Sequence, residues 1–451
     1  MSEQPPRMPG GLPFLGHALE FRRNPVAFLQ RGRRQFGEVY AIRLPGTRAT
    51  VLTGPRANQA FFTAPDDQLS SKDAYQFTVP IFGRGIAYDA LPEVMDEQLG
   101  FVVPALRKDS MHRYAGQIHE EVEGYFENWK DEGEVDLLSA TQAVTTYVAS
   151  RCLLGWEFRS RVTEEFLHLY HDLEKGLTPL SFFFPHLPLP AFRRRDRARV
   201  RIGEMVSQVI AGRKATGGRR DDFLQILVES RYASGVALKD DEIAGLLLTF
   251  LFAGHHTSAV LAAWTGILLL QHPRYLQPVL KEQQDIYGDG QEVTFESLGR
   301  SVLLERAIKE AERLYPPLFV LMRKVLRDFR YGGYVSPAGD MVAVSPSVSH
   351  RIPEIFADPD RYDPDRFAPG REEDQKQPHS LIGFGGGKHR CLGYHFAYTQ
   401  IKAIWSVLLR RFDLELAGSA YEPDYNTFVA GPRQPCMVRY RRRLRKQIPT
   451  R

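Results

Sequence analysis

The feature that most constrains this chain of 451 residues is a cysteine at the end of a glycine-rich turn. Residues 384–393 read Phe-Gly-Gly-Gly-Lys-His-Arg-Cys-Leu-Gly, and an amphipathic segment, residues 396–409, follows at once. Glycine lets the backbone approach a flat, bulky group because no Cβ atom intervenes. A cysteine that opens a helix beside basic residues favours the thiolate. The pattern predicts that Cys391 is a metal ligand; the alternative is a buried core cysteine.

Composition and charge give no indication of a nucleic-acid partner. Hydrophobic residues make up 43% of the chain and charged residues 25%, as in ordinary globular proteins. The tail, residues 439–451, holds seven Lys and Arg and no acid, which exceeds the net charge of +5. The rest of the chain is therefore slightly acidic. We interpret the tail as a solvated end, with a membrane-surface or partner contact as the alternative.

The sequence predicts a soluble, cytoplasmic protein. Its three cysteines are too few and too scattered for a disulfide framework. Residues 1–16 contain no apolar stretch, so we expect neither a signal peptide nor a transmembrane anchor. The longest apolar segment, residues 243–270, is interrupted by His255 and His256, which would be costly at the centre of a bilayer. It is therefore expected to be a buried helix.

Hydrophobic periodicity predicts a mainly α fold with a minor β portion, formed by one large α-rich domain over residues 1–451. Residues 97–231 are helical in pattern with breaks near Gly133, Gly155 and Gly176. The other expected elements are a hairpin (38–43 and 49–53), a helix at 55–64, a central helix from Asp240 or Asp241 to His272, and a helix at 301–314.

Two segments are unusually rich in aromatic residues for loops. Residues 70–92 either pack into the core or form a lid over a ligand. Residues 182–184 are three consecutive phenylalanines followed by a proline-rich stretch. They predict a mobile apolar flap, and the alternative is a loop tucked onto the surface.

Two further motifs carry polar groups at helical spacing. Glu310 and Arg313 share one helix face, which alone indicates only a surface ion pair, and Arg366 follows in Asp-Pro-Asp-Arg-Phe. In the central helix, residues 253–258 read Ala-Gly-His-His-Thr-Ser. The Thr257 hydroxyl can bond to an upstream carbonyl and open a groove in the helix. Close packing against another helix would also explain the Ala-Gly pair.

Taken together, these motifs resemble those of the cytochrome P450 family. The pattern Phe-x-x-Gly-x-His-x-Cys-x-Gly is similar to its haem-thiolate loop, and the other motifs occur in the family's order. The resemblance implies a P450 fold and haem b with Cys391 as the axial ligand. It also implies cofactor contacts from Phe384, Gly385 and His389, and a structural lock behind the haem formed by Glu310, Arg313 and Arg366.

One branch of the family, the sterol 14α-demethylases, is the most similar. It keeps a histidine where most members have an acid before the threonine, which here gives His256 and Thr257 as proton-relay residues. Residues 75–89 resemble its second signature. This resemblance implies haem propionate contacts from Tyr75 and Arg323. The substrate-binding residues that it implies are Phe77, Phe82, Phe252, Ala253, Leu318, Val320 and Met322.

One segment departs from the branch. Basic residues that reach the propionates usually follow the position of Asp89, but residues 93–97 here are Glu-Val-Met-Asp-Glu. Arg107 or Lys108 would be the substitute base. In this branch a phenylalanine at the position of Phe77 goes with sterols that carry one methyl group at C4, so we expect that preference here.

The resemblance implies removal of the sterol 14α-methyl group by three successive oxidations that consume O2 and release formate. Electrons would come from an external NAD(P)H-dependent donor, because no flavin or iron–sulfur motif is present. Azole inhibitors should bind. The alternatives are a haem-thiolate hydroxylase of another terpenoid or steroid, and a haem sensor without turnover. Five basic residues near the cysteine loop are expected to dock an acidic ferredoxin: Lys388, Arg390, Lys402, Arg410 and Arg411.

Overall fold

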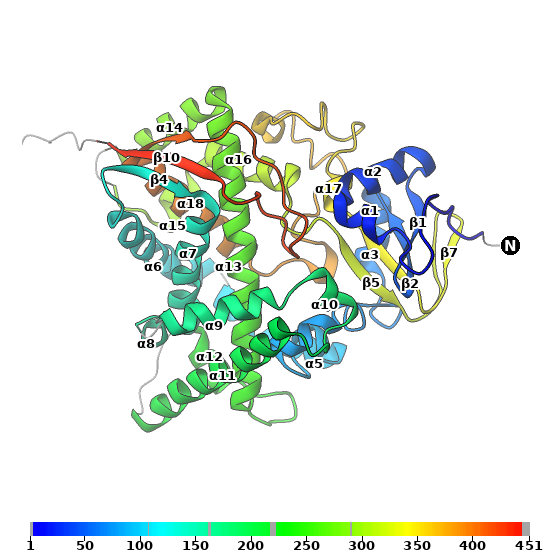
Figure 1. Cartoon of the computed structure of the whole chain (residues 1–451). Helices are drawn as coiled ribbons and strands as arrows, with labels where there is room; N and C mark the ends of the chain where they lie inside the picture. Colours follow the sequence, from blue (N-terminus) through cyan, green and yellow to red (C-terminus); the bar gives the residue numbers. More distant parts are fainter. Residues whose placement is uncertain (1–2, 107, 161–163, 217–221, 289–290, 444–451) are drawn as a thin grey trace, which may run out of the picture.

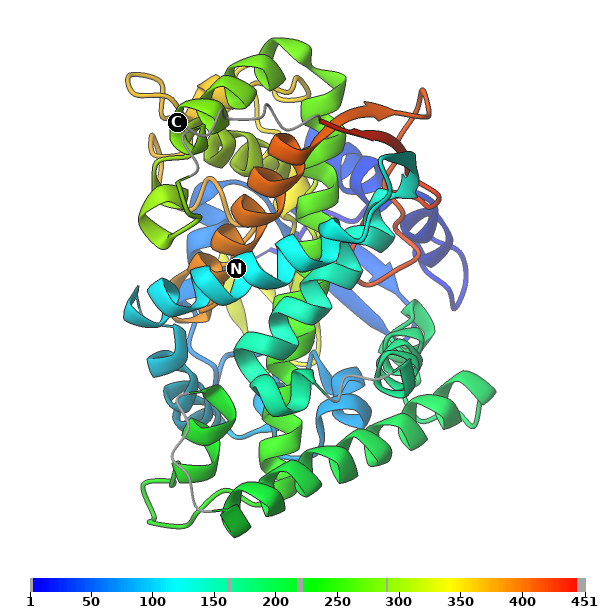
Figure 2. The ribbon, with the colours of Figure 1, turned by 90° about the vertical axis from the view of Figure 1, so that its left-hand side faces the viewer.

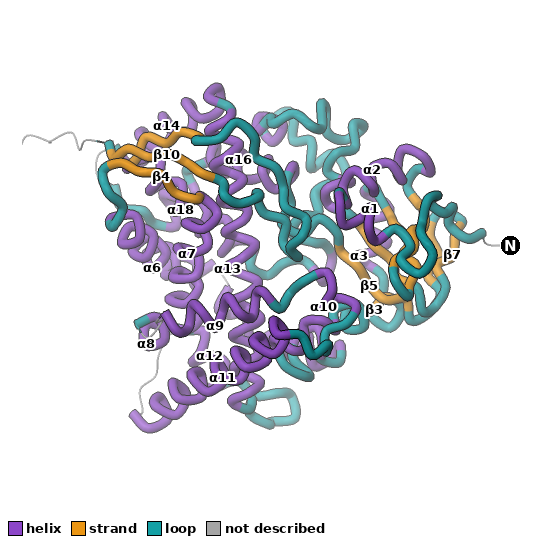
Figure 3. The backbone as a smooth tube through the Cα atoms, viewed as in Figure 1, coloured by secondary structure: helices purple, strands orange, loops and turns teal. Residues whose placement is uncertain are grey.

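The computed structural model of the chain describes residues 3–106, 108–160, 164–216, 222–288 and 291–443. Helices form most of the molecule, and the larger sheet lies at one side of them with the first helices (Figures 1 and 3). The mainly α fold with small sheets is as the sequence predicts. The α-helices are α1 (Ala18–Arg23), α2 (Pro25–Phe36), α3 (Pro55–Thr63), α4 (Val79–Phe82), α5 (Pro92–Val102), α6 (Lys108–Glu127), α7 (Leu137–Ala149), α8 (Trp156–Arg159), α9 (Glu164–Lys175), α10 (Pro179–Phe183), α11 (Pro190–Thr216), α12 (Phe223–Glu229), α13 (Asp240–Gln271), α14 (Pro273–Tyr287), α15 (Phe295–Gly299), α16 (Val302–Leu314), α17 (Pro346–Ser349) and α18 (Tyr394–Arg411).

The strands form three small sheets. The largest has the order β1-β2-β8-β5-β3, in which β1 and β2 are the predicted hairpin and β2 runs parallel to β8. The second has the order β4-β10-β9, and the third pairs β6 with β7. The strands are β1 (Val39–Leu44), β2 (Thr47–Leu52), β3 (Leu69–Ser70), β4 (Glu132–Asp136), β5 (Leu321–Val325), β6 (Phe329–Tyr331), β7 (Tyr334–Ser336), β8 (Met341–Val344), β9 (Phe412–Leu416) and β10 (Met437–Arg442).

The long helix α13 runs through the middle of the molecule, and α7, α11, α16 and α18 pack against it (Figures 1 and 2). Its N-cap is Lys239 and not Asp240 or Asp241: the Glu242 carboxylate accepts the Lys239 N–H at 2.7 Å. The acids of the first turn favour the positive end of the helix dipole. Among the described helices, α13 alone is long and apolar enough to cross a membrane, but 61% of its most apolar window is buried in the fold.

A close contact fixes α18, the helix after the cysteine loop, against α13. The Trp405 indole N–H donates to the Ala262 carbonyl at 2.9 Å. Gly266 makes room for the indole, because a Cβ at that position would lie 2.0 Å from the Trp405 ring. This packing sets the position of the cysteine loop relative to the middle of α13.

The basic tail and the triple-phenylalanine segment contain more regular structure than the sequence predicts. The basic tail does not begin as a solvated end: residues 437–442 form β10, which pairs with β4 and β9. Phe182 and Phe183 of the triple-phenylalanine segment lie in α10, whose start is closed by reciprocal hydrogen bonds between Thr178 and Ser181, and Phe184 follows the helix and is 54% exposed. Phe182 faces Phe77, with ring centroids 5.2 Å apart. Residues 444–451 of the tail lie outside the described residues.

Candidate functional site

The cysteine loop needs glycine at two positions for its own backbone. Gly385 (φ +74°) and Gly387 (φ +57°) adopt the left-handed region. A Cβ at Gly385 would lie 2.7 Å from the His389 carbonyl oxygen, and one at Gly387 would lie 2.8 Å from the Phe62 carbonyl oxygen. The loop therefore folds tightly on itself and against α3.

Cys391 precedes the following helix and does not open it, contrary to expectation. Gly393 is the N-cap of α18, and the Cys391 N–H donates to the Phe384 carbonyl at 2.8 Å. Burial raises the pKa of the Cys391 thiol, and a hydrogen bond from the Gly393 N–H offsets this only in part. The protein alone therefore favours the thiol, and a bound metal cation is needed to make it a thiolate.

Cys391 and Tyr88 both keep accessible surface. Cys391 is exposed, and Tyr88 is 40% exposed, although burial raises the pKa of its hydroxyl. These two side chains are therefore accessible to a ligand. Tyr88 stacks on Tyr75 at 4.9 Å, and the Tyr75 hydroxyl accepts a bond from the Met322 N–H at 3.4 Å.

Arg323 brings a buried positive charge to the same region. It is 2% exposed and donates to the Phe61 carbonyl at 2.9 Å, with its guanidinium over the Phe61 ring. Within the described residues, no carboxylate lies within 4.0 Å of it. A buried cation with no directly paired carboxylate is costly, so an acidic ligand would stabilise this site.

His389 and Lys388 share one acid on the other side of the loop. The His389 Nε2 lies 2.9 Å from the Asp66 Oδ1, and Lys388 forms an ion pair with the same carboxylate. Burial would raise the Asp66 pKa, but the bonds from Lys388 and His389 hold it below its ordinary value. Asp66 therefore anchors the basic side of the cysteine loop.

The hydrogen bond predicted within α13 is present. The Thr257 hydroxyl donates to the Ala253 carbonyl at 2.6 Å, as the sequence predicts. Ala253 is exposed and Gly254 half-buried in the middle of a helix that is otherwise largely buried. A Cβ at Gly254 would lie 3.9 Å from the ring of Phe396, which belongs to α18. This part of α13 therefore lies near α18, the helix that follows Cys391.

His256 pairs with an acid from another helix. Its Nδ1 lies 3.0 Å from the Oε1 of Glu174 in α9. Burial would raise the Glu174 pKa, but hydrogen bonds from His171 and His256 and the nearby imidazole charge hold it well below its usual range. Glu174 is therefore ionised at neutral pH, and its negative charge can hold and orient the His256 imidazole.

The aromatic side chains predicted to bind substrate pack against other aromatic rings. Phe77 contacts Phe182 and Phe428, with centroids 5.2 and 5.0 Å away. Phe82 lies 5.8 Å from Phe252 in an edge-to-face arrangement. The other predicted substrate contacts are half-buried along the chain into β5: Leu318, Val320 and Met322.

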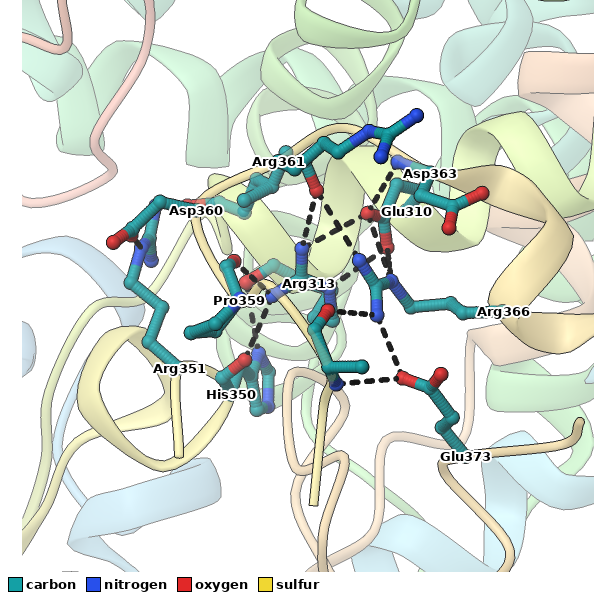
Figure 4. Close-up of polar contacts among 12 residues, drawn as sticks. Glu310, Arg313, His350, Arg351, Pro359, Asp360, Arg361, Asp363, Arg366 and Glu373 are labelled. Carbon is teal, nitrogen blue, oxygen red and sulfur yellow. Dashed lines mark hydrogen bonds and ion pairs between the residues drawn. The ribbon is translucent and has the colours of Figure 1, made fainter. Parts of the chain in front are cut away.

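Glu310, Arg313 and Arg366 form a fully buried ion network (Figure 4). Arg313 donates to both Glu310 oxygens at 2.7 and 2.9 Å, and the Arg366 Nε lies 3.0 and 3.1 Å from the same two oxygens. Arg366 also bonds Glu373 at 2.6 Å. The three predicted residues are thus brought together, and they tie α16 to residues 357–373.

His350 links this network to the cysteine loop. The Arg313 guanidinium donates to the His350 carbonyl at 2.8 Å. The His350 Nε2 accepts the Ile382 N–H at 2.8 Å, so its Nδ1 carries the proton and donates to the Arg313 carbonyl at 3.2 Å. Ile382 comes just before the loop, so the network positions the start of that loop.

The acidic segment 93–97 lies in α5. The Glu97 carboxylate accepts the Ala233 N–H at 2.6 Å, which ties α5 to the loop before α13. Arg107 and the side chain of Lys108, the expected substitute bases, lie outside the described residues. Arg323 is therefore the buried base that the described structure offers to an acidic ligand.

The predicted docking cluster is smaller than expected. Lys402 is buried and forms an ion pair with Glu305, while Arg410 and Arg411 both pair with Glu123. Of the five, Lys388 and Arg390 stay exposed at the loop. The docking hypothesis therefore rests on these two residues.

Four residues beside the site are not among those predicted from the sequence: Glu174, Asp66, Tyr88 and Glu312. Glu312 is fully buried and accepts the Tyr398 O–H at 2.9 Å. Burial raises its pKa to about 7. A carboxyl of this kind next to Arg313 is unexpected from the sequence, where it resembles another surface acid.

Residues 6–438 match the family described as Cytochrome P450. The chain is 42% identical over 446 residues to the sterol 14-demethylase of Arabidopsis thaliana, covering 97% of this chain and 91% of that one. It is 41% identical over 446 residues to the sterol 14alpha-demethylase of Mycolicibacterium vanbaalenii, covering 98% of both. The retinoic acid-bound cyanobacterial CYP120A1 superposes with a TM-score of 0.87 at 26% identity, covering 98% of this chain and 100% of that one.

The chain therefore belongs to the cytochrome P450 family, whose members hold haem through a cysteine thiolate. Within that family, it is similar to sterol 14-demethylases over nearly the whole chain. The residues present fit the cofactor: Cys391 is a free, exposed cysteine, and Arg323 is a buried cation with no carboxylate within 4.0 Å in the described residues.

Proposed function

We propose that this protein is a haem-thiolate monooxygenase that removes the 14α-methyl group of a sterol. The observation that carries the proposal is the arrangement on α13, where Thr257 bonds back to Ala253 and the adjacent His256 pairs with Glu174. The near-full-length similarity to sterol 14-demethylases from a plant and a bacterium supports the substrate class. The methyl group would leave as formate after alcohol and aldehyde stages, with a 14,15 double bond left in the sterol.

Haem b, ligated through Cys391, supplies oxygen activation and the oxidising chemistry. The Arg323 guanidinium and the Tyr75 hydroxyl would hold the haem carboxylates. His389 and the backbone of Phe384 and Gly385 would contact the haem from the cysteine loop. Pairing with the haem carboxylates would offset the free-energy cost of burying the Arg323 charge.

The protein's own part in the reaction is proton supply and positioning. Glu174 would hold the His256 imidazole in place through its Nδ1, and His256 and the Thr257 hydroxyl would pass protons to the reaction site. Phe77, Phe82 and Phe252 would pack on the sterol rings and exclude water. Ala253, Leu318, Val320 and Met322 complete the proposed substrate contacts.

The two electrons of each cycle would come from an external NAD(P)H-dependent chain. An acidic ferredoxin would dock at Lys388 and Arg390, which are exposed beside the cysteine loop. Azoles would bind to the haem iron through a nitrogen lone pair. We place the protein in the cytoplasm because the apolar helix α13 is a core helix and the three cysteines are unpaired.

A spectral titration of the purified holoprotein tests the substrate class. Lanosterol and a C4-monomethyl sterol are each added while the Soret band is followed. A saturable blue shift at micromolar sterol supports the proposal. A normal CO-reduced band with no sterol response contradicts it and favours a hydroxylase of another terpenoid or steroid.

A further inference from the structure

Four side chains capable of binding a metal converge between α9 and α13. Glu174 is the centre of the group: its Oε1 lies 3.0 Å from the Nδ1 of His256 and 3.6 Å from the Nδ1 of His255. Its other oxygen lies 3.9 Å from the Nδ1 of His171, one turn earlier on α9. The ligand atoms of Glu174, His255 and His256 all lie within 4.8 Å of one another.

These separations are close to those of a metal site. Zinc binds imidazole nitrogen and carboxylate oxygen at about 2.0–2.2 Å, which places tetrahedral donors about 3.4 Å apart. The distances from the Glu174 Oε1 to the two α13 histidines bracket that value. Small side-chain rotations, without backbone movement, would therefore complete the coordination.

His255 is oriented as a ligand. Its Nε2 lies 3.0 Å from the Gln142 carbonyl oxygen, which can only accept, so the Nε2 carries the proton. The lone pair of the Nδ1 therefore points toward Glu174 and the Tyr170 hydroxyl, 3.3 Å away. A backbone carbonyl that fixes the far nitrogen of a histidine is the usual support of a metal-bound imidazole.

The protein environment favours the neutral form of this histidine. His255 is 2% exposed, and burial lowers its pKa to about 4. A neutral imidazole and an ionised carboxylate then face each other, and a cation between them would bind both. His256 and His171 are more accessible, which gives an ion a route into the site.

We propose that Zn²⁺ binds between α9 and α13, with Glu174, His255 and His256 as ligands and His171 or water in the fourth position. The ion would occupy the Nδ1 of His256 and fasten α9 to α13. On the proposed function, this removes the proton carrier beside Thr257, so zinc acts as a reversible inhibitor of turnover.

The binding itself is tested by calorimetry with ZnCl₂ on the purified holoprotein, without sterol or reductase. One zinc per chain at micromolar concentration is expected. Glu174→Gln and His256→Ala should each weaken binding by at least about tenfold. His168→Ala is the matched control, since His168 is an exposed histidine on the same helix, and it should bind as wild type does.

X-ray absorption at the zinc edge distinguishes this site from binding at a cysteine. Nitrogen and oxygen ligands without sulfur support the proposal, whereas sulfur ligation overturns it. No saturable binding, or equal affinity in wild type and both ligand variants, also overturns it. These measurements require no turnover. A failure of the zinc proposal can therefore be distinguished from a failure of the proposed sterol demethylation.

Discussion

His256 and Glu174 meet across α13 and α9, with the imidazole Nδ1 3.0 Å from the carboxylate Oε1. Most family members are expected to carry an acid directly before the threonine, and this chain has histidine there instead. The carboxylate nearest to that histidine comes from a different helix. Hydrogen bonds and nearby imidazoles hold the pKa of Glu174 well below its ordinary range.

Glu174→Gln should lower kcat for sterol turnover by about tenfold or more, because positioned proton transfer contributes 10²–10⁴-fold in enzymes. The spectral Kd for sterol should change little, since Glu174 is not among the proposed sterol contacts. The solvent deuterium isotope effect on kcat should increase. His168→Ala, on the same helix α9, is the control. If Glu174→Gln left kcat and the isotope effect unchanged, a proton-relay role would be contradicted.

Arg366→Ala should destabilise the fold and reduce haem incorporation. It removes one partner of a fully buried ion network, which typically costs about 3–5 kcal/mol. Denaturant unfolding and the yield of the CO-reduced band measure the two effects. Arg371→Ala is the control, because Arg371 pairs with Asp363 and Glu373 but is 41% exposed, and should cost less than about 1 kcal/mol. Equal effects of the two variants would refute the structural role of the network.

Glu312→Gln should stabilise the protein above neutral pH. Burial raises the Glu312 pKa from 4.5 to about 7, so the folded state holds a proton that the unfolded state releases. Folding stability is then lost as the pH rises from about 4.5 to about 7, and stays lower above it. The neutral amide avoids this loss and still accepts from Tyr398.

The melting temperature of Glu312→Gln should therefore exceed that of wild type by a few degrees near about pH 8, with little difference near about pH 5. Thermal unfolding across this range checks the sign. A variant less stable than wild type at high pH would mean that ionised Glu312 is stabilising.

Phe77→Leu should relax the preference between sterols. The wild-type protein is expected to bind a C4-monomethyl sterol more tightly than lanosterol, because the ring of Phe77, packed on Phe182 and Phe428, leaves less room than an aliphatic side chain. Leucine should bring the two affinities closer, by about tenfold at most. Spectral titration with both sterols measures the ratio, and equal wild-type affinities would remove the basis for this prediction.

Charge reversal at the cysteine loop should slow reduction by a ferredoxin. Arg390→Glu is the cleaner variant, because Lys388 also pairs with Asp66 and its reversal would disturb the loop. The reduction rate at low ionic strength should fall by about tenfold or more, since complementary charge acts mainly on association. Arg197→Glu on α11 serves as the matched control. Equal rates for both variants would argue against docking at this face.

The sequence was sufficient where partners are close in the chain or match a known motif. The i,i+3 spacing of Glu310 and Arg313 predicts their shared face, and the bond from Thr257 to Ala253 follows from one helical turn. Local signals also place the hairpin β1–β2 and the ends of α13 to within a few residues.

Pairings between distant segments and the burial of individual polar side chains could not be predicted from the sequence. Glu174 and His256 are 82 positions apart, and neither segment carries a pattern that points to the other. In the sequence, Glu312 cannot be distinguished from an ordinary surface acid. Its burial depends on the packing of α16 against α18. The start of the basic tail became β10 because its backbone pairs with β4 and β9, which charge composition does not predict.

The most direct test of the central claim is turnover of a 14α-methyl sterol by the purified holoprotein with a ferredoxin and its NAD(P)H-dependent reductase. The account predicts a 14-demethylated sterol and formate in equal amounts, formed only with O2 and electrons. Hydroxylation at another carbon without formate, or no product from a protein that is fully reduced and binds CO, would contradict it.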